Sequence, residues 1–180
     1  IFFIILTAID MIVSNPLRHN NSNEMWFLPG DPNLVAFEKL QDLFGSSEYL
    51  IVGVTARDND KDIFEYETLM MIDEISTMLE DHEIVEQVRS ISKYQRTYDK
   101  NGMVATDDLI EDFEELGDNP IIIENAREII KGEELALDSI ITSDLKHTRI
   151  LARTEYRAND NSHKIKVVND LRDFIKEKGY

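Results

Sequence analysis

The chain opens with a nearly continuous apolar run from Ile1 to Val13, which only Asp10 interrupts with a charge. As an α-helix this run would be roughly 20 Å long, whereas the apolar core of a bilayer is about 30 Å thick. No initiator Met precedes it. We therefore expect residues 1–14 to be the C-terminal part of a transmembrane helix. A signal-peptide core without the usual flanks, or a buried first strand or core helix, are the alternatives.

A turn and an amphipathic helix follow. Asp31 is a good helix cap, Pro32 suits the first helical position, and Gly45 ends the pattern. Between them apolar residues recur at helical spacing, namely Leu34, Phe37, Leu40 and Phe44. A helix of this kind needs an apolar surface on which to dock.

The next segments predict a strand, a helix and a second strand. Tyr49 to Thr55 is apolar and rich in β-branched residues, which is typical of a central strand covered on both faces. Asp58 to Asp62 then caps a long helix, and Ile84 to Ile91 reads as the returning strand. The apolar stripe of the helix is expected to contain Phe64, Met71, Ile75 and Met78, with Leu79 beside it.

The remainder predicts a helical insertion, a β-hairpin and a last helix. Two helical periods, Leu109 to Leu116 and Ile121 to Ile130, place the insertion at about 103–134. Ile140 to Ser143 and Thr148 to Tyr156 read as strands joined by a turn at Asp144 to Lys146. The last helix follows a cap at residues 159–162, and its inward residues are expected to be Ile165, Val168, Leu171 and Ile175.

This order predicts an α+β fold. It matches a ferredoxin-like split β-α-β unit, with helices on one face of a mainly antiparallel sheet and a two-helix insertion. Such a layout needs one more strand, so we expect the final strand to be missing. The sheet edge left open would favour pairing with another segment or a homo-oligomer.

Composition narrows the class of protein. A length of 180 residues and an apolar fraction of 42% fit one folded domain rather than a disordered chain, despite a net charge of -17. Such an acidic chain would repel phosphates, which argues against nucleic-acid binding. The charge is read as a solvated surface, with adaptation to high salt as the alternative. The absence of cysteine removes disulfides, thiolate catalysis and Cys-ligated zinc.

No pattern of residues indicates a catalytic, cofactor or metal site. Asp58 to Asp62 resembles the start of a calcium loop, but Ile63 and Leu69 stand where Gly and a bidentate Glu are required. The four histidines are isolated and are expected at the surface: His19, His82, His147 and His163. Ser46, Ser47 and Ser90 lack the surroundings of a nucleophile.

Clustered carboxylates and methionines also have ordinary explanations. Glu111, Asp112, Glu114 and Glu115, and likewise Asp81 with Glu83, are expected on exposed faces rather than in an apolar pocket that would separate their pKa values. Met70, Met71 and Met78 could line an adaptable groove but are more simply core residues. We predict that the chain is not an enzyme and needs no cofactor.

Several segments form an ordered series along the chain: Leu28–Pro32, Ala36–Leu40, Phe44-Gly45, Leu50–Val54, Thr68-Leu69 with Ile72, Val85–Ser92, Ile141–Asp144 and Thr148–Ala152. With the apolar run before it, this series resembles the first extracytoplasmic loop of resistance-nodulation-division (RND) exporters. The nearest branch is that of the mycobacterial large membrane proteins and hopanoid transporters. One departure is Asp144-Leu145-Lys146, because the family often has Asp-Gly there, so the turn is expected to differ in shape.

The resemblance implies that residues 15–180 are an extracytoplasmic α/β porter domain of a proton-driven membrane exporter. Such a domain would gate a path for a lipid-like or amphipathic substrate by conformational change. Its partners would be the transmembrane helices and second porter loop of the same transporter, which also hold the proton-relay carboxylates. The alternative is a membrane-tethered extracytoplasmic sensor or small-ligand-binding domain.

Overall fold

The computed structural model describes residues 26–45, 48–58, 60–117, 119–157 and 162–180. The segment 1–14 and His19 lie outside these ranges. In chain order the elements are α2 (Pro32–Phe44), β1 (Tyr49–Thr55), α3 (Tyr66–Glu80), β2 (Val85–Arg89), β3 (Gln95–Lys100), β4 (Met103–Asp108), the 3-10 helix η2 (Glu114–Gly117), α4 (Pro120–Ile130), β5 (His147–Thr154) and α5 (Ser162–Lys178). Within the described ranges, no helix has both the length and the apolar character needed to cross a bilayer.

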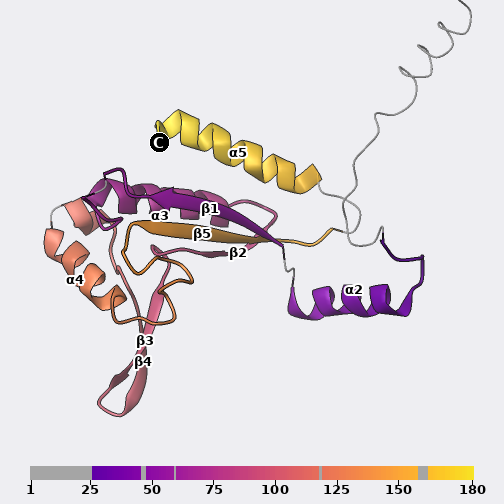
Figure 1. Ribbon diagram of the computed structural model, residues 1–180, viewed down its shortest axis with the longest axis horizontal. Coiled ribbons are helices and arrows are strands. Elements are labelled where there is room, and N and C mark those ends of the chain that lie inside the picture. Colours follow the sequence, from indigo (N-terminus) through magenta and orange to yellow (C-terminus); the bar gives the residue numbers. More distant parts are fainter. Residues whose placement is uncertain (1–25, 46–47, 59, 118, 158–161) are drawn as a thin grey trace, which may run out of the picture.

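The central feature is a three-stranded sheet in the order β1-β5-β2. β5 is antiparallel to both neighbours, so β1 and β2 are parallel and α3 connects them across the intervening strand. This is a split β-α-β unit. α3 packs against β2, β5 and α5, and the hairpin β3–β4 projects away from the sheet (Figure 1). The predicted α+β, ferredoxin-like class is confirmed.

The core lies between the sheet and the helices α3 and α5. β5 alternates strictly, so Thr148, Ile150, Ala152 and Thr154 are buried while the residues between them are not. α3 offers a helical stripe and α5 adds two apolar residues; together these are Leu69, Ile72, Ile75, Leu79, Val167 and Leu171. Burying such residues stabilises the fold by about 1.5 to 3 kcal/mol each.

β1 is an edge strand, so its predicted central position is wrong. Only Val54 is fully buried, whereas Tyr49 is 50% and Ile51 59% exposed. The central strand is β5, which pairs on both sides. The apolar run of β1 predicted burial on both faces of the strand, but Tyr49 and Ile51 face solvent instead of the core.

The segment expected to hold two helices contains a hairpin as well. Residues 103–108 form β4, and only a 3-10 turn at Glu114–Gly117 replaces the helix predicted over Leu109 to Leu116. The helix from Pro120 to Ile130 is confirmed. The hairpin predicted for Ile140 to Ser143 and Thr148 to Tyr156 is shorter than expected, because Ile141 makes only isolated bridges, one to Leu137 and one to Thr148.

The inward faces of two helices differ in detail from the prediction. α3 begins at Tyr66, after Asp62 has accepted a hydrogen bond from the backbone N–H of Phe64 at 2.9 Å. In α5 the buried apolar residues are Leu171, as predicted, and Val167, while Ile165 is 61% exposed. The methionines at 70, 71 and 78 are half-buried against the core, as their interpretation as core residues predicts.

Candidate functional site

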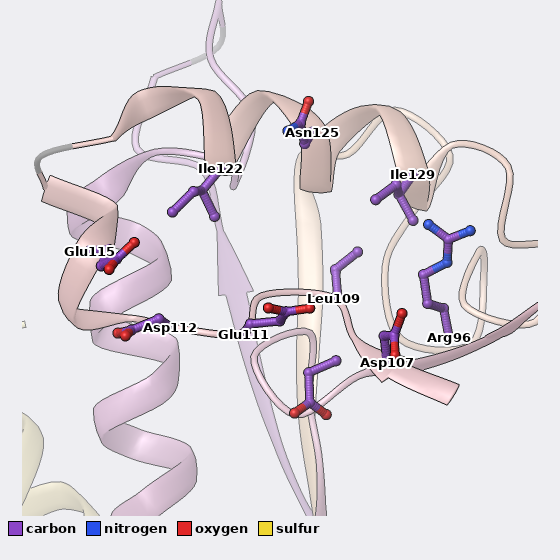
Figure 2. Close-up of a pocket in the computed structure, with 10 residues that line it drawn as sticks. Arg96, Asp107, Leu109, Glu111, Asp112, Glu115, Ile122, Asn125 and Ile129 are labelled. Atoms are coloured by element: carbon purple, nitrogen blue, oxygen red, sulfur yellow. The ribbon is translucent and has the colours of Figure 1, made fainter. Parts of the chain in front are cut away.

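A cleft of about 280 Å³ lies between the end of β4, the turn into η2, and α4 (Figure 2). Its walls combine acidic side chains, one arginine and an apolar floor. The lining residues are Arg96, Asp107, Asp108, Leu109, Glu111, Asp112, Glu115, Ile122, Asn125 and Ile129. The cleft is therefore amphipathic and predominantly acidic.

The hairpin positions one wall of this cleft. The Tyr98 hydroxyl donates to Asp107 at 2.5 Å, and Gln95 donates to Asp108 at 2.9 Å. The guanidinium of Arg96 lies 4.4 Å from the centre of the Tyr98 ring, a cation–π distance. The bond to Asp107 raises the pKa of Tyr98, because it favours the protonated phenol.

The other wall comes from η2 and α4. Asp112 caps η2, since its carboxylate accepts the backbone N–H of Glu114 at 2.8 Å. Ile122 and Ile129 on α4 are half-buried and form the floor with the buried Leu109. The paired carboxylates are exposed as predicted, but the sequence did not show that some of them border a cleft.

The chemistry of the cleft is set by its carboxylates and its apolar floor. Of the carboxylates, Asp107 is half-buried and the others are exposed to water, and none of the ten lining residues is a His, Ser, Thr or Lys. Among the residues that the structure describes, no group of three or more His, Asp or Glu side chains is arranged to hold a metal ion. The arrangement favours a molecule that carries positive charge beside an apolar part.

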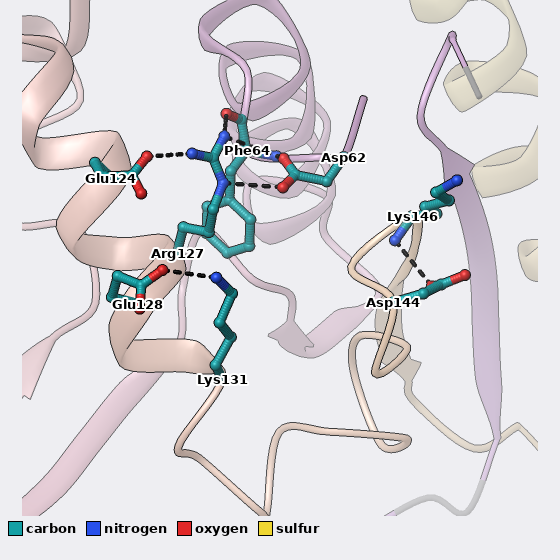
Figure 3. Close-up of polar contacts among 8 residues, drawn as sticks. All are labelled: Asp62, Phe64, Glu124, Arg127, Glu128, Lys131, Asp144 and Lys146. Carbon is teal, nitrogen blue, oxygen red and sulfur yellow. Dashed lines mark hydrogen bonds and ion pairs between the residues drawn. The ribbon is translucent and has the colours of Figure 1, made fainter. Parts of the chain in front are cut away.

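Arg127 of α4 forms the most connected polar cluster near this cleft (Figure 3). Its Nε lies 2.9 Å from Asp62, and its Nη2 donates to the Phe64 carbonyl at 3.0 Å. It also pairs with Glu124 on its own helix. Arg127 therefore fixes α4 to the segment before α3, and with it the floor of the cleft. Residues 65 positions apart in sequence meet here, which no local pattern reveals.

The predicted surface position of the histidines is correct for His147 and wrong for His163. His147 is exposed, and its Nδ1 lies 3.1 Å from the Thr55 hydroxyl. His163 is only 5% exposed, with Nε2 3.3 Å from the Glu155 carbonyl. His82 is intermediate, and its Nε2 lies 3.2 Å from Asp170 of α5. The two less exposed histidines join α5 to the body, a structural role.

Asp62, Ser90 and Glu83, which were also considered for chemistry, have structural partners. Asp62, at the end of the calcium-like segment, binds Arg127 and the Phe64 N–H. Ser90 is buried in a hydroxyl cluster, 2.9 Å from Ser76 and 3.0 Å from Ser92. Glu83 pairs with Lys166 of α5 at 2.7 Å, and that hydrogen bond lowers the pKa of Glu83.

No family model, curated protein or solved structure matches this chain.

Proposed function

We propose that the chain is an extracytoplasmic porter domain of an RND-type, proton-driven membrane exporter. The observation that carries the proposal is the sheet order β1-β5-β2 with α3 crossing between parallel β1 and β2. It is the split β-α-β architecture that the sequence resemblance implies. The resemblance supplies the transport function, which the fold alone does not specify.

The side-chain chemistry is compatible with this role. A porter domain acts by moving as a rigid unit against other parts of a transporter, with its energy source elsewhere. The core between the sheet, α3 and α5 and the Arg127 cluster supply rigidity. The acidic cleft with an apolar floor would suit an amphipathic substrate or a surface that borders its path.

A membrane-tethered sensor or ligand-binding domain is the second candidate, and the cleft of Figure 2 is the observation that favours it. In that case the cleft would be the main binding site rather than a wall of a transport path. Both candidates place the domain outside the cytoplasm, so sidedness alone does not separate them.

The complete coding region separates the two candidates. The exporter requires about a dozen spanning segments and a second domain of this fold, whereas one or two spans followed by a signalling domain would refute it. Cells that express the complete gene should then retain less of a lipophilic fluorescent probe. A proton uncoupler should abolish the difference, and a difference that the uncoupler leaves unchanged would contradict proton-driven export.

A further inference from the structure

A groove of about 600 Å³ lies between the end of β2, the start of β3, β5 and the segment that connects α4 to β5. It shares no lining residue with the cleft of Figure 2. No carboxylate lines it, although 36 of the 180 residues are Asp or Glu, and three cations do. The lining residues are Gln87, Val88, Arg89, Ser90, Lys93, Tyr94, Gln95, Leu135, Ser139, Ile140, Arg149 and Leu151. The groove is therefore basic, on a chain with a net charge of -17.

Strand register brings two of these cations together. Leu151 lies opposite Arg89 across the β2–β5 pair, and Arg149 is two residues from Leu151 on the same side of β5. Arg149 is thus a diagonal neighbour of Arg89, with a Cβ separation of about 7 Å that two long side chains can bridge. Like charges at such positions repel one another, and an anion between them removes the repulsion.

The charges of these two arginines are not neutralised by the protein. Arg89 is exposed, and within the described ranges neither Arg89 nor Arg149 forms an ion pair. Arg149 donates from Nε to the Ser139 carbonyl, which holds its guanidinium at the groove and leaves the terminal nitrogens for another acceptor. Lys93, in contrast, pairs with two carboxylates of α3 at 3.3 and 3.4 Å. The positive charge available in the groove is that of the two arginines.

An apolar wall adjoins the arginines. Leu135 is 86% exposed at the rim, and Ile140 and Leu151 are half-buried. The Tyr94 ring is fixed beside them, because its hydroxyl donates to Glu133 at 3.0 Å. A ligand with an apolar part would remove this exposed apolar surface from water, which favours binding.

We propose that this groove binds an anionic amphiphile, a molecule in which a carboxylate or phosphate group is joined to an apolar body. The oxyanion accepts charge-assisted hydrogen bonds from Arg89 and Arg149. The apolar body lies against Leu135, Ile140 and Leu151. An uncharged amphiphile would leave both arginines unpaired, and a free oxyanion would leave the apolar wall in water. This binding does not depend on the exporter role, so its failure would leave that proposal standing.

Titration calorimetry on the full chain tests the class of ligand. Octyl phosphate, below the concentration at which it forms micelles, should bind at one site. Octan-1-ol should bind at least about tenfold more weakly, because it lacks the charge, and inorganic phosphate should show no binding at millimolar concentration. Equal affinity for octan-1-ol or for inorganic phosphate would overturn the proposal.

Arg89→Gln tests the charged half of the site. Loss of its charge-assisted hydrogen bonds should weaken octyl phosphate binding by about tenfold or more. Arg172→Gln is the matched control, since Arg172 is an exposed arginine of α5, on the opposite face of the sheet. It changes the net charge equally and should alter the affinity by less than about twofold. An equal loss in both variants would show general electrostatics rather than a site.

Leu135→Ser tests the apolar half. It should weaken octyl phosphate binding by about fivefold, whereas Ile165→Ser, at a residue of α5 that is 61% exposed, should not change it. Both substitutions are at exposed side chains, so the fold should persist, and urea unfolding checks that it does. An octyl phosphate affinity that is the same in the parent, Arg89→Gln and Leu135→Ser would refute the site.

Discussion

Leu145 shows how one residue departs from its expected backbone conformation. It occupies the turn before β5 with φ of 58°, a left-handed value that glycine adopts most easily. Its side chain is only 4% exposed and belongs to the core. A leucine holds this left-handed conformation although glycine would adopt it with less strain. Burial of the side chain offsets the backbone strain.

Replacing Leu145 by glycine should therefore destabilise the protein. Relief of the left-handed strain contributes about 1 kcal/mol, whereas loss of a buried leucine costs about 2 to 5 kcal/mol. We expect a net loss of about 2 kcal/mol in the free energy of unfolding, measured in urea. Asp138→Gly is the control, because Asp138 has φ of 60° but is exposed, and it should change stability by less than about 1 kcal/mol. A Leu145→Gly variant as stable as the parent would show that burial of this side chain contributes little.

At the level of elements, the C-terminal end of α5 is fixed to α3 by one carboxylate. Glu74 accepts a hydrogen bond from Tyr180 at 2.7 Å and pairs with Lys178 at 2.5 Å. The bonds from Lys178 and Tyr180 lower the pKa of Glu74 from its ordinary 4.5. Burial, together with the bond to Glu74, raises the pKa of Tyr180 from 10.0 to about 12.

These two pKa shifts set a lower and an upper pH limit for the contribution of this contact to stability. The lowered pKa of Glu74 means that its contribution is present above pH 4.5 and is lost as the pH falls through the folded-state pKa. The raised pKa of Tyr180 means that its contribution is complete below pH 10.0 and is lost as the pH rises towards 12. The stability difference between the parent and Glu74→Gln should be about 0.5 to 1 kcal/mol near neutral pH and shrink outside these limits.

Urea unfolding of both proteins across this pH range measures the difference. Glu128→Gln removes an exposed pair with Lys131 on α4 and is the control, for which we expect a change of less than about 0.5 kcal/mol. A Glu74→Gln difference that stayed constant from pH 3 to pH 12 would contradict the assigned contacts.

Some elements were predictable because their signals are local. Asp31 and Pro32 begin α2, and Asp31 accepts the Asn33 N–H at 2.8 Å as a cap should. Asn101-Gly102 in the β3–β4 hairpin is an equally local signal, because Asn-Gly is typical of a hairpin turn, and both residues take left-handed φ values of 59° and 82°. That hairpin was missed because the helical spacing that follows it was extended backwards to residue 103.

At the scale of the whole molecule, the sequence predicted the fold class and the order of most elements, but not the β3–β4 hairpin or which strands pair. Tyr49 and Ile51 look like core residues in sequence, yet β1 is an edge strand and they face outwards. The cleft likewise depends on Arg127 meeting Asp62 across 65 residues. Such contacts arise from tertiary packing, which periodicity does not encode.

The central proposal, that this α+β domain lies outside the cytoplasm, is tested most directly by labelling a single cysteine. Val104 is 83% exposed and Ala126 is fully buried, so Val104→Cys is the probe and Ala126→Cys the matched control. Intact cells that express the complete gene are treated with a membrane-impermeant maleimide. We predict that Val104→Cys is labelled without lysis and that Ala126→Cys is not. Labelling of Val104→Cys only after the cells are opened would contradict the account.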